Sequence, residues 1–208
     1  MKHAIWYFDF VSPFAYLHAA QIHTLACSIE PRPVLFAGLL DHWGQKGPAE
    51  IEGKRTYTYR YLQWLASRRG IPFRMPATHP FNPLPFLRLA IALECDMKAI
   101  AQIFEFLYTR AEDPSSPEAW AQLCRQLGVD DGHVLVSQPR VKSGLRQNFE
   151  HAIGSGVFGV PTVVVDDRLF WGEDSLEMLR DYLNDPTLFD SAEMQRASTI
   201  KASAARRT

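Results

Sequence analysis

The chain opens with a nearly continuous run of aromatic and branched apolar residues. Residues 5–11 read Ile-Trp-Tyr-Phe-Asp-Phe-Val, a composition typical of a short strand buried on both faces. Apolar residues then recur at helical spacing from Phe14 to Leu25. Between these two patterns, Ser12 can cap a helix with its hydroxyl, and Pro13 suits the first helical position. The pattern therefore predicts a strand that runs directly into a helix at Ser12.

A second strand is predicted shortly after this helix. Residues 29–33 (Ile-Glu-Pro-Arg-Pro) read as a break, and Val34-Leu35-Phe36 as a short buried strand. A strand, a helix and a strand in this order predict a parallel pair. Residues 37–53 contain several glycines and are expected to form a loop beside a site.

Helical periodicity dominates the middle of the chain. The predicted helices are Lys54–Arg69, Phe86–Glu94, Met97–Arg110, Glu118–Leu127 and Pro139–Ile153, and residues 129–136 form a short helix or a turn. Residues 71–85 contain five prolines and are expected to be extended and rigid. This segment either forms a wall of an apolar pocket or covers the core.

Strand patterning resumes near the end of the chain. Residues 161–165 and 168–171 predict a hairpin turning at Asp166-Asp167, and Asp174 or Ser175 is expected to cap a helix that reaches Leu183. The tail from residue 190 to 208 lacks an apolar face and is expected to be frayed or disordered. The chain thus divides into an α/β frame (1–49 and 154–188), a helical insertion (50–153) and a tail (189–208).

Composition and charge favour neither a nucleic-acid nor a membrane partner. The 208 residues are 47% hydrophobic and 22% charged, with a net charge of -1, which gives no support to nucleic acid or an anionic membrane as a partner. No apolar run approaches the roughly 18 residues that a membrane helix needs. The N-terminus leads directly into strand sequence without a signal peptide, so we expect a cytoplasmic protein.

Cysteine and histidine spacing predicts neither disulfides nor a metal site. Cys27, Cys95 and Cys124 are far apart and are expected to be reduced structural thiols. The histidines form no recognisable ligand pair. Gly154–Gly159 matches the pattern G-x-G-x-x-G, but it follows a predicted helix and precedes a strand, the reverse of the order that nucleotide binding requires.

Ser12 has two interpretations at this point. Its hydroxyl can simply cap the helix, or the free N–H groups and the helix dipole beside it can bind an anion. Val160-Pro161 stands at the start of a predicted strand, where an X-Pro bond can be cis.

Three stretches in the same order resemble one family. Phe8–Leu17, His79–Leu84, and Val157–Thr162 continuing through Phe170–Asp174 are similar to 2-hydroxychromene-2-carboxylate isomerases, which belong with the kappa-class glutathione transferases. The resemblance covers about residues 4–184 and implies a thioredoxin-like fold with an inserted all-helical domain, as in DsbA-like proteins. Ser12-Pro13-Phe14-Ala15 stands where those oxidoreductases carry Cys-x-x-Cys.

The resemblance also implies glutathione as cofactor. Ser12 would hold the glutathione thiolate, whose pKa the helix dipole lowers. The backbone of Val160, ahead of Pro161, would pair with the main chain of glutathione. Asp174 would bind the γ-glutamyl ammonium, with Glu173 or Ser175 close by.

Two further contacts follow from the same resemblance. Lys54 would meet a glutathione carboxylate, and Asn82 would lie near the thiol or the substrate. Simpler roles remain open: Asp174 as a helix cap, Lys54 as a solvated helix residue, and Asn82 as a turn residue. Tyr61 stands where the family often has an acidic residue, and Glu173 replaces a small polar residue found in some relatives.

The activity implied is a glutathione-dependent cis-trans isomerisation of 2-hydroxychromene-2-carboxylate or a related aromatic oxo-acid. Lys54, Arg55, Arg88 and the proline-rich segment are consistent with an acidic, apolar substrate. The alternatives are a glutathione transferase acting on small electrophiles and a non-catalytic thioredoxin-like binding module. A dithiol oxidoreductase ranks lowest because no cysteine lies near Ser12 in the motif. Relatives are often dimers, which implies a homodimer.

Overall fold

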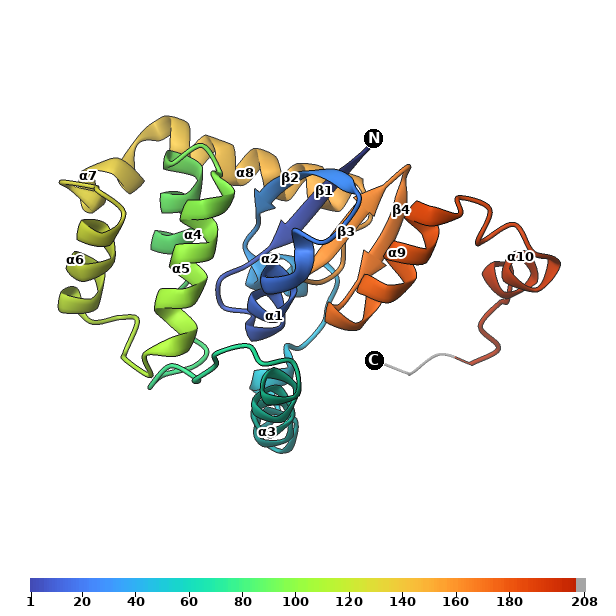
Figure 1. Cartoon of the computed structure of the whole chain (residues 1–208), viewed down its shortest axis with the longest axis horizontal. Coiled ribbons are helices and arrows are strands. Elements are labelled where there is room, and N and C mark those ends of the chain that lie inside the picture. Colours follow the sequence, from blue (N-terminus) through green and yellow to red (C-terminus); the bar gives the residue numbers. More distant parts are fainter. Residues whose placement is uncertain (205–208) are drawn as a thin grey trace.

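A four-stranded sheet forms the centre of the molecule. The computed structural model describes residues 1–204. Its strands are β1 (Lys2–Phe8), β2 (Cys27–Pro33), β3 (Thr162–Val165) and β4 (Arg168–Trp171), in the order β2-β1-β3-β4. β2 runs parallel to β1, whereas β3 runs antiparallel to both β1 and β4. This is the expected α/β frame, with β1 at its centre (Figure 1).

The second strand lies earlier in the sequence than predicted. β2 includes the expected break at residues 29–33, and Val34–Phe36 is not a strand. Pro31 and Pro33 are tolerated because β2 is an edge strand, where a proline need not donate to a neighbour. Residues 37–53 are also not wholly a loop, since they contain most of helix α2 (Phe36–His42) and the short η1 helix (Pro48–Glu50).

The junction at Ser12 forms as predicted. Helix α1 spans Pro13–Ile22, and the Ser12 hydroxyl accepts a hydrogen bond from the Ala15 N–H at 3.2 Å. Pro13 occupies the first helical position. The prediction that the Ser12 hydroxyl caps this helix is therefore confirmed.

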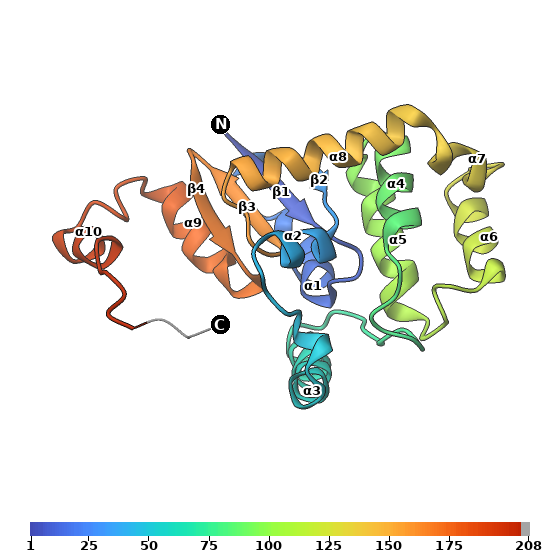
Figure 2. The ribbon, with the colours of Figure 1, turned by 180° about the vertical axis from the view of Figure 1, so that it is seen from behind.

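Helices follow one another between the second and third strands. After α2 and η1 come α3 (Glu52–Arg68), α4 (Leu84–Ala92), α5 (Met97–Thr109), α6 (Pro117–Gln126), α7 (Gly132–Ser137) and α8 (Pro139–Gly154). The predicted helices are confirmed, and residues 71–83 have no regular structure. The pair α6 and α7 lies at one end of the molecule, and the long helix α8 returns the chain to the sheet (Figure 2).

The C-terminal region differs from expectation in two details. Helix α9 (Leu176–Asn184) follows the short η2 helix (Glu173–Ser175), but no side chain caps it, and the Ser175 hydroxyl donates to the Gly172 carbonyl at 2.8 Å. The tail contains helix α10 (Ala192–Ser198), capped by Ser191. It lies at the opposite end of the molecule from α6 and α7 (Figure 1). Part of the expected disordered tail, residues 205–208, lies outside the described residues.

Alternate residues of β1 pack into separate cores on the two faces of the sheet. Trp6 and Phe8 join the larger core with Phe104 of α5, whereas Tyr7 packs with Val34 and residues of α2 and α8. The three cysteines are free thiols. No helix in residues 1–204 combines the length and hydrophobicity needed to cross a membrane.

Candidate active site

A cavity of about 750 Å³ opens beside the junction of β1 and α1. Its walls come from segments that are far apart in the sequence: residues 9–14, 36–50, 58–61, 79–83, 158–161 and 171–174. Most lining side chains are apolar or aromatic, among them Phe14, Phe36, Phe81, Phe158 and Trp171. The volume is within the range of small-molecule sites.

Ser12 lies at the cavity wall with its backbone tightly held. Its side chain caps α1, its N–H donates to the Asp9 carbonyl at 3.0 Å, and the residue is only 7% exposed. The hydroxyl keeps a hydrogen to donate, since capping uses only its oxygen as an acceptor. An anion in the cavity at this helix N-terminus would meet that donor together with the positive end of the helix dipole.

Asp9 also lines the candidate site, although the sequence did not single it out. It is fully buried, lines the cavity, and accepts hydrogen bonds from the Val11 N–H at 3.0 Å and the Phe36 N–H at 2.8 Å. Burial raises the pKa of its carboxyl to about 7, although the backbone N–H groups oppose the shift. The signal in the sequence was one acidic residue inside a hydrophobic run. Asp9 joins the turn before Ser12 to the start of α2.

Tyr59 and His79 form a second polar group at the cavity wall. The His79 Nε2 lies 2.7 Å from the Val11 carbonyl, and its Nδ1 lies 2.6 Å from the Tyr59 hydroxyl. Burial lowers the pKa of His79 and raises that of Tyr59. His79 begins the stretch His79–Leu84 that resembles the family. Tyr59 has no such signal, because the helical periodicity of α3 does not distinguish it from the neighbouring residues.

Val160 and Pro161 also line the cavity. The Val160-Pro161 bond is cis, as is His79-Pro80. The Pro161 carbonyl accepts from the Gly172 N–H at 2.9 Å, which places the 172–174 turn beside them. Asp174 is exposed at the same cavity, so Ser12, Val160, Pro161 and Asp174 are brought together.

Glu173 lines the cavity, but its charge has a protein partner. The carboxylate is 4% exposed, forms an ion pair with Arg69 at the end of α3, and lies 3.5 Å from the Gln21 amide. Arg69 thus compensates the extra carboxylate beside Asp174. Ser175 is bonded to Gly172 and is not part of the cavity wall.

Lys54 and Asn82 lie outside the cavity wall. Both are exposed, and the Asn82 side-chain Oδ1 accepts from the Leu84 N–H at 3.1 Å, as expected of a turn residue. Arg55 and Arg88 also lie outside the wall. The cation that does line it is Lys46, in a loop whose composition gave no specific signal.

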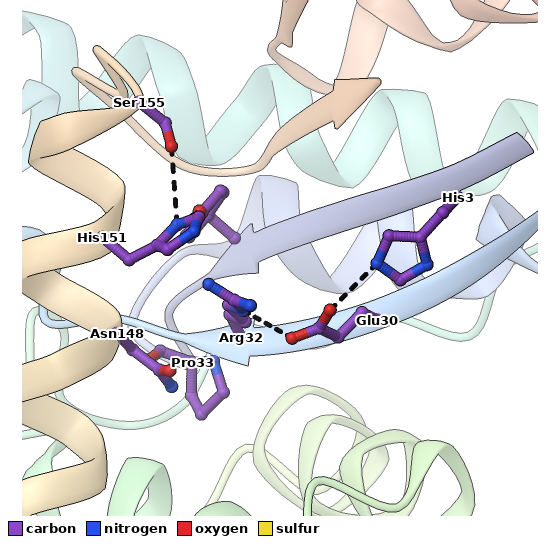
Figure 3. Close-up of polar contacts among 8 residues, drawn as sticks. His3, Glu30, Arg32, Pro33, Asn148, His151 and Ser155 are labelled. Atoms are coloured by element: carbon purple, nitrogen blue, oxygen red, sulfur yellow. Dashed lines mark hydrogen bonds and ion pairs between the residues drawn. The ribbon is translucent and has the colours of Figure 1, made fainter. Parts of the chain in front are cut away.

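A separate polar cluster joins β1, β2 and the end of α8 (Figure 3). Glu30 of β2 bonds His3 of β1 at 2.9 Å and Arg32 at 2.6 Å, and the Asn148 amide of α8 donates to the Pro33 carbonyl at 3.1 Å. None of these side chains lines the cavity. The cluster ties the edge strand to its neighbours and is distinct from the candidate site.

The fold and the site together define a thioredoxin-like protein with a serine at the helix N-terminus. The chain belongs to the DSBA-like thioredoxin domain family, which matches residues 5–184. The expected fold class is thereby confirmed. None of the three cysteines lines the cavity.

The particular relatives support the resemblance found in the sequence. The chain is 28% identical to 2-hydroxychromene-2-carboxylate isomerase of Sphingobium xenophagum over 86% of its own length and 97% of the relative's. It is also 28% identical to glutathione S-transferase kappa 2 of Caenorhabditis elegans, with coverage of 87% and 91%. A solved structure of 2-hydroxychromene-2-carboxylate isomerase shares the fold with a TM-score of 0.77 at 23% identity, covering 96% of this chain and 100% of that one. These names support an enzyme of this family.

Proposed function

We propose that this protein is a glutathione-dependent cis-trans isomerase of 2-hydroxychromene-2-carboxylate or a related aromatic-degradation intermediate. The observation that carries the proposal is Ser12, a capping serine that lines a large apolar cavity at the N-terminus of α1. The names of the relatives, which include isomerases and glutathione transferases, point to the same chemistry.

Glutathione would occupy the side of the cavity formed by Ser12, Val160 and Asp174. The Ser12 hydroxyl would donate to the thiolate, and the dipole of α1 would favour its negative charge. The backbone of Val160 would pair with the tripeptide main chain. Asp174 is free to bind the ammonium group, because the neighbouring carboxylate of Glu173 is already paired with Arg69.

The second substrate would occupy the aromatic part of the cavity. Phe36 and Phe81 offer apolar surface to a ring, and Lys46 offers a cation to a carboxylate. The thiolate adds to the conjugated double bond of the ring-opened oxo-acid. Rotation then occurs about the resulting single bond, and elimination of the thiolate restores the double bond in the trans form. Glutathione is regenerated, so the reaction needs no further reactant.

The test measures glutathione binding by calorimetry, the pKa of the bound thiol and isomerase turnover. These are compared between the wild type and Ser12→Ala, with Ser67→Ala on the exposed face of α3 as control. We expect Ser12→Ala to raise the pKa of the bound thiol and to lower isomerase turnover by roughly 10- to 100-fold. Ser67→Ala should match the wild type. Absence of glutathione binding by the wild type would contradict the proposal, and an unchanged Ser12→Ala would favour a non-catalytic binding module.

A glutathione transferase is the second candidate, favoured by the similarity to the kappa-class enzyme. It uses the same thiolate but leaves glutathione bonded to an electrophile. Turnover with model electrophiles, compared with loss of the chromene absorbance, separates the two reactions. Faster conjugation than isomerisation would identify the protein as a transferase.

A further inference from the structure

Tyr59 and His79 line the cavity, yet the proposed addition and elimination give them no task. Tyr59 lies on α3, His79 lies in the proline-rich segment, and the Val11 carbonyl that His79 contacts belongs to the residue before Ser12. The two side chains therefore join the aromatic part of the cavity to the turn that carries Ser12.

The hydrogen-bond partners fix where the protons lie. The Val11 carbonyl can only accept, so the His79 Nε2, 2.7 Å away, carries a hydrogen. In the neutral ring, Nδ1 is then an acceptor, and the Tyr59 hydroxyl at 2.6 Å donates to it. Burial lowers the pKa of His79 and so favours the neutral ring. The Tyr59 oxygen is left with a lone pair for a donor in the cavity.

We propose that Tyr59 and His79 form a proton relay that accepts the hydroxyl proton of the second substrate. The inference rests on the proposed isomerase function. As the substrate O–H bond breaks, its proton moves to the Tyr59 oxygen, and the Tyr59 proton moves to Nδ1 of His79. The substrate becomes an oxyanion and His79 an imidazolium. The imidazolium then donates to the Val11 carbonyl and to the Tyr59 oxygen.

The geometry accommodates both states of the relay. The Tyr59 oxygen lies 3.1 Å from the His79 carbonyl as well as 2.6 Å from Nδ1. Once Nδ1 carries a proton, the Tyr59 hydroxyl can turn its own hydrogen to that carbonyl and accept from Nδ1. No group needs to move other than the hydroxyl hydrogen.

The relay supplies a step that the substrate requires. A 2-hydroxychromene is a cyclic hemiketal, and loss of its hydroxyl proton lets the ring C–O bond break to give a ketone and a phenolate. Return of the proton from His79 through Tyr59 to the phenolate leaves the ring-opened oxo-acid neutral at that oxygen. The relay returns to its starting state, as an isomerisation demands. Tyr59 would be the catalytic residue, and His79 would act through it.

The first experiment compares turnover with glutathione affinity in Tyr59→Phe and His79→Gln. The glutamine amide can still donate to the Val11 carbonyl but cannot take up a proton, so it separates the basic function from the structural one. We expect kcat to fall roughly 100-fold in both variants, while the Kd of glutathione changes less than about twofold and the KM of the chromene rises no more than about fivefold. Tyr57→Phe on the same helix, 70% exposed and outside the cavity wall, should match the wild type.

A wild-type kcat in Tyr59→Phe would overturn the relay and leave the proposed isomerase function intact. If kcat falls in Tyr59→Phe but not in His79→Gln, the proton does not pass to the imidazole, and the relay is wrong. Thermal unfolding of each variant shows whether a loss of turnover is accompanied by loss of the fold.

The second experiment does not depend on turnover. Binding of trans-2-hydroxycinnamate and trans-cinnamate is measured calorimetrically for the wild type and Tyr59→Phe. Because one hydrogen bond is at stake, we expect the wild type to bind the hydroxylated acid about fivefold more tightly and Tyr59→Phe to show no preference. Equal binding of both acids by the wild type would contradict the relay. A retained preference in a wild type that lacks isomerase activity would contradict only the proposed function.

Discussion

Gly172 adopts a backbone conformation that places Asp174 at the cavity. Its φ is +96°, in the region that favours glycine, and a Cβ at this position would lie 2.5 Å from the Asp174 Oδ1. Any side chain here would therefore meet the carboxylate expected to bind the ammonium of glutathione. Gly172 follows the last residue of β4, and its lack of a side chain leaves space for the Asp174 carboxylate.

Gly172→Ala is expected to weaken glutathione binding. The methyl group displaces the Asp174 carboxylate, and the positive φ adds backbone strain of about 1–2 kcal/mol. Calorimetric titration should show roughly a 10-fold higher Kd together with a lower unfolding temperature. The control is Gly53→Ala near the start of α3, where nothing lies within 4 Å of an added Cβ. An unchanged Kd in Gly172→Ala would argue against a role for Asp174.

Ser12 and Asp174 were predictable from sequence in a way that Asp9 and Tyr59 were not. The local sequence predicted a helix cap or an anion site at Ser12 but only a helix cap at Asp174, which does not form, so the place of Asp174 at the site came from the family resemblance. Asp9 depends on the N–H of Phe36, and Tyr59 on His79, both distant in sequence. Tertiary packing determines which residues from distant segments become partners, and the periodicity of one helix or strand does not predict this packing.

The elements that were misplaced are those whose local composition conflicts with their tertiary environment. β2 contains two prolines, which have no N–H to donate. The strand still forms because it lies at the sheet edge, where these positions need no N–H to bond a neighbouring strand. α10 forms in a polar tail because Ser191 caps it, without any buried residue. The amphipathic helices, in contrast, were predicted within a few residues because their own pattern determines which face packs.

Three elements meet at the ion pair between Arg69 and Glu173. Arg69 directly follows α3, Glu173 begins η2, and Gln21 of α1 lies 3.5 Å from the same carboxylate. The Glu173 side chain is 3% exposed, whereas that of Arg69 is 31% exposed. Loss of Arg69 therefore leaves a buried Glu173 carboxylate without a cation. Loss of the Glu173 charge leaves an Arg69 guanidinium that is partly in water.

Arg69→Met is expected to destabilise the protein more than Glu173→Gln. The first leaves a buried carboxylate without its cation, at a cost of roughly 2–3 kcal/mol, whereas the second leaves a guanidinium that water can reach. The double variant, Arg69→Met with Glu173→Gln, should be more stable than Arg69→Met alone, because the unpaired buried charge is removed. Urea unfolding measures all three, with Arg68→Met as control, since Arg68 is exposed and lies over the Trp64 ring. Equal losses in the two single variants would contradict this view of the pair.

At the scale of the whole molecule, β1 brings the two halves of the site together. Its pairing with β3, from Ile5↔Val164 to Tyr7↔Thr162, sets Val160 and the 172–174 turn beside the β1–α1 junction. The chain between them folds as helices α3 to α8, and α3 contributes Tyr59 and Tyr61 to the cavity. The central strand thus positions every part of the proposed glutathione site.

The same region buries two titratable groups whose effects on stability oppose each other. Burial raises the pKa of Asp9 to about 7 from its ordinary 3.8, and lowers that of His18 to about 3 from its ordinary 6.5. His18 is fully buried on α1, stacks against Trp6 with ring centroids 5.9 Å apart, and has no hydrogen-bond partner in the described residues. Each group is therefore neutral in the native state over most of the acidic range.

The signs follow from proton binding. Between about pH 3 and 6.5 the unfolded chain binds a proton at His18 that the native state does not, so this group makes stability rise with pH. Between about pH 3.8 and 7 the native state keeps the Asp9 proton that the unfolded chain loses, so this group makes stability fall with pH. Where the two ranges overlap, the slopes cancel, each being about 1.4 kcal/mol per pH unit at most.

Single substitutions should expose the two slopes separately. In His18→Phe, which keeps an aromatic ring on Trp6, the free energy of unfolding relative to wild type should fall as pH rises from 4 to 6.5, because the variant lacks the His18 contribution that rises with pH in the wild type. In Asp9→Asn the relative stability should rise over the same interval, on top of a constant loss from one broken backbone hydrogen bond. Urea unfolding at several pH values measures both difference curves, in which the contributions of unchanged carboxylates cancel. Parallel curves for the two variants would show that these buried groups do not titrate as the structure implies.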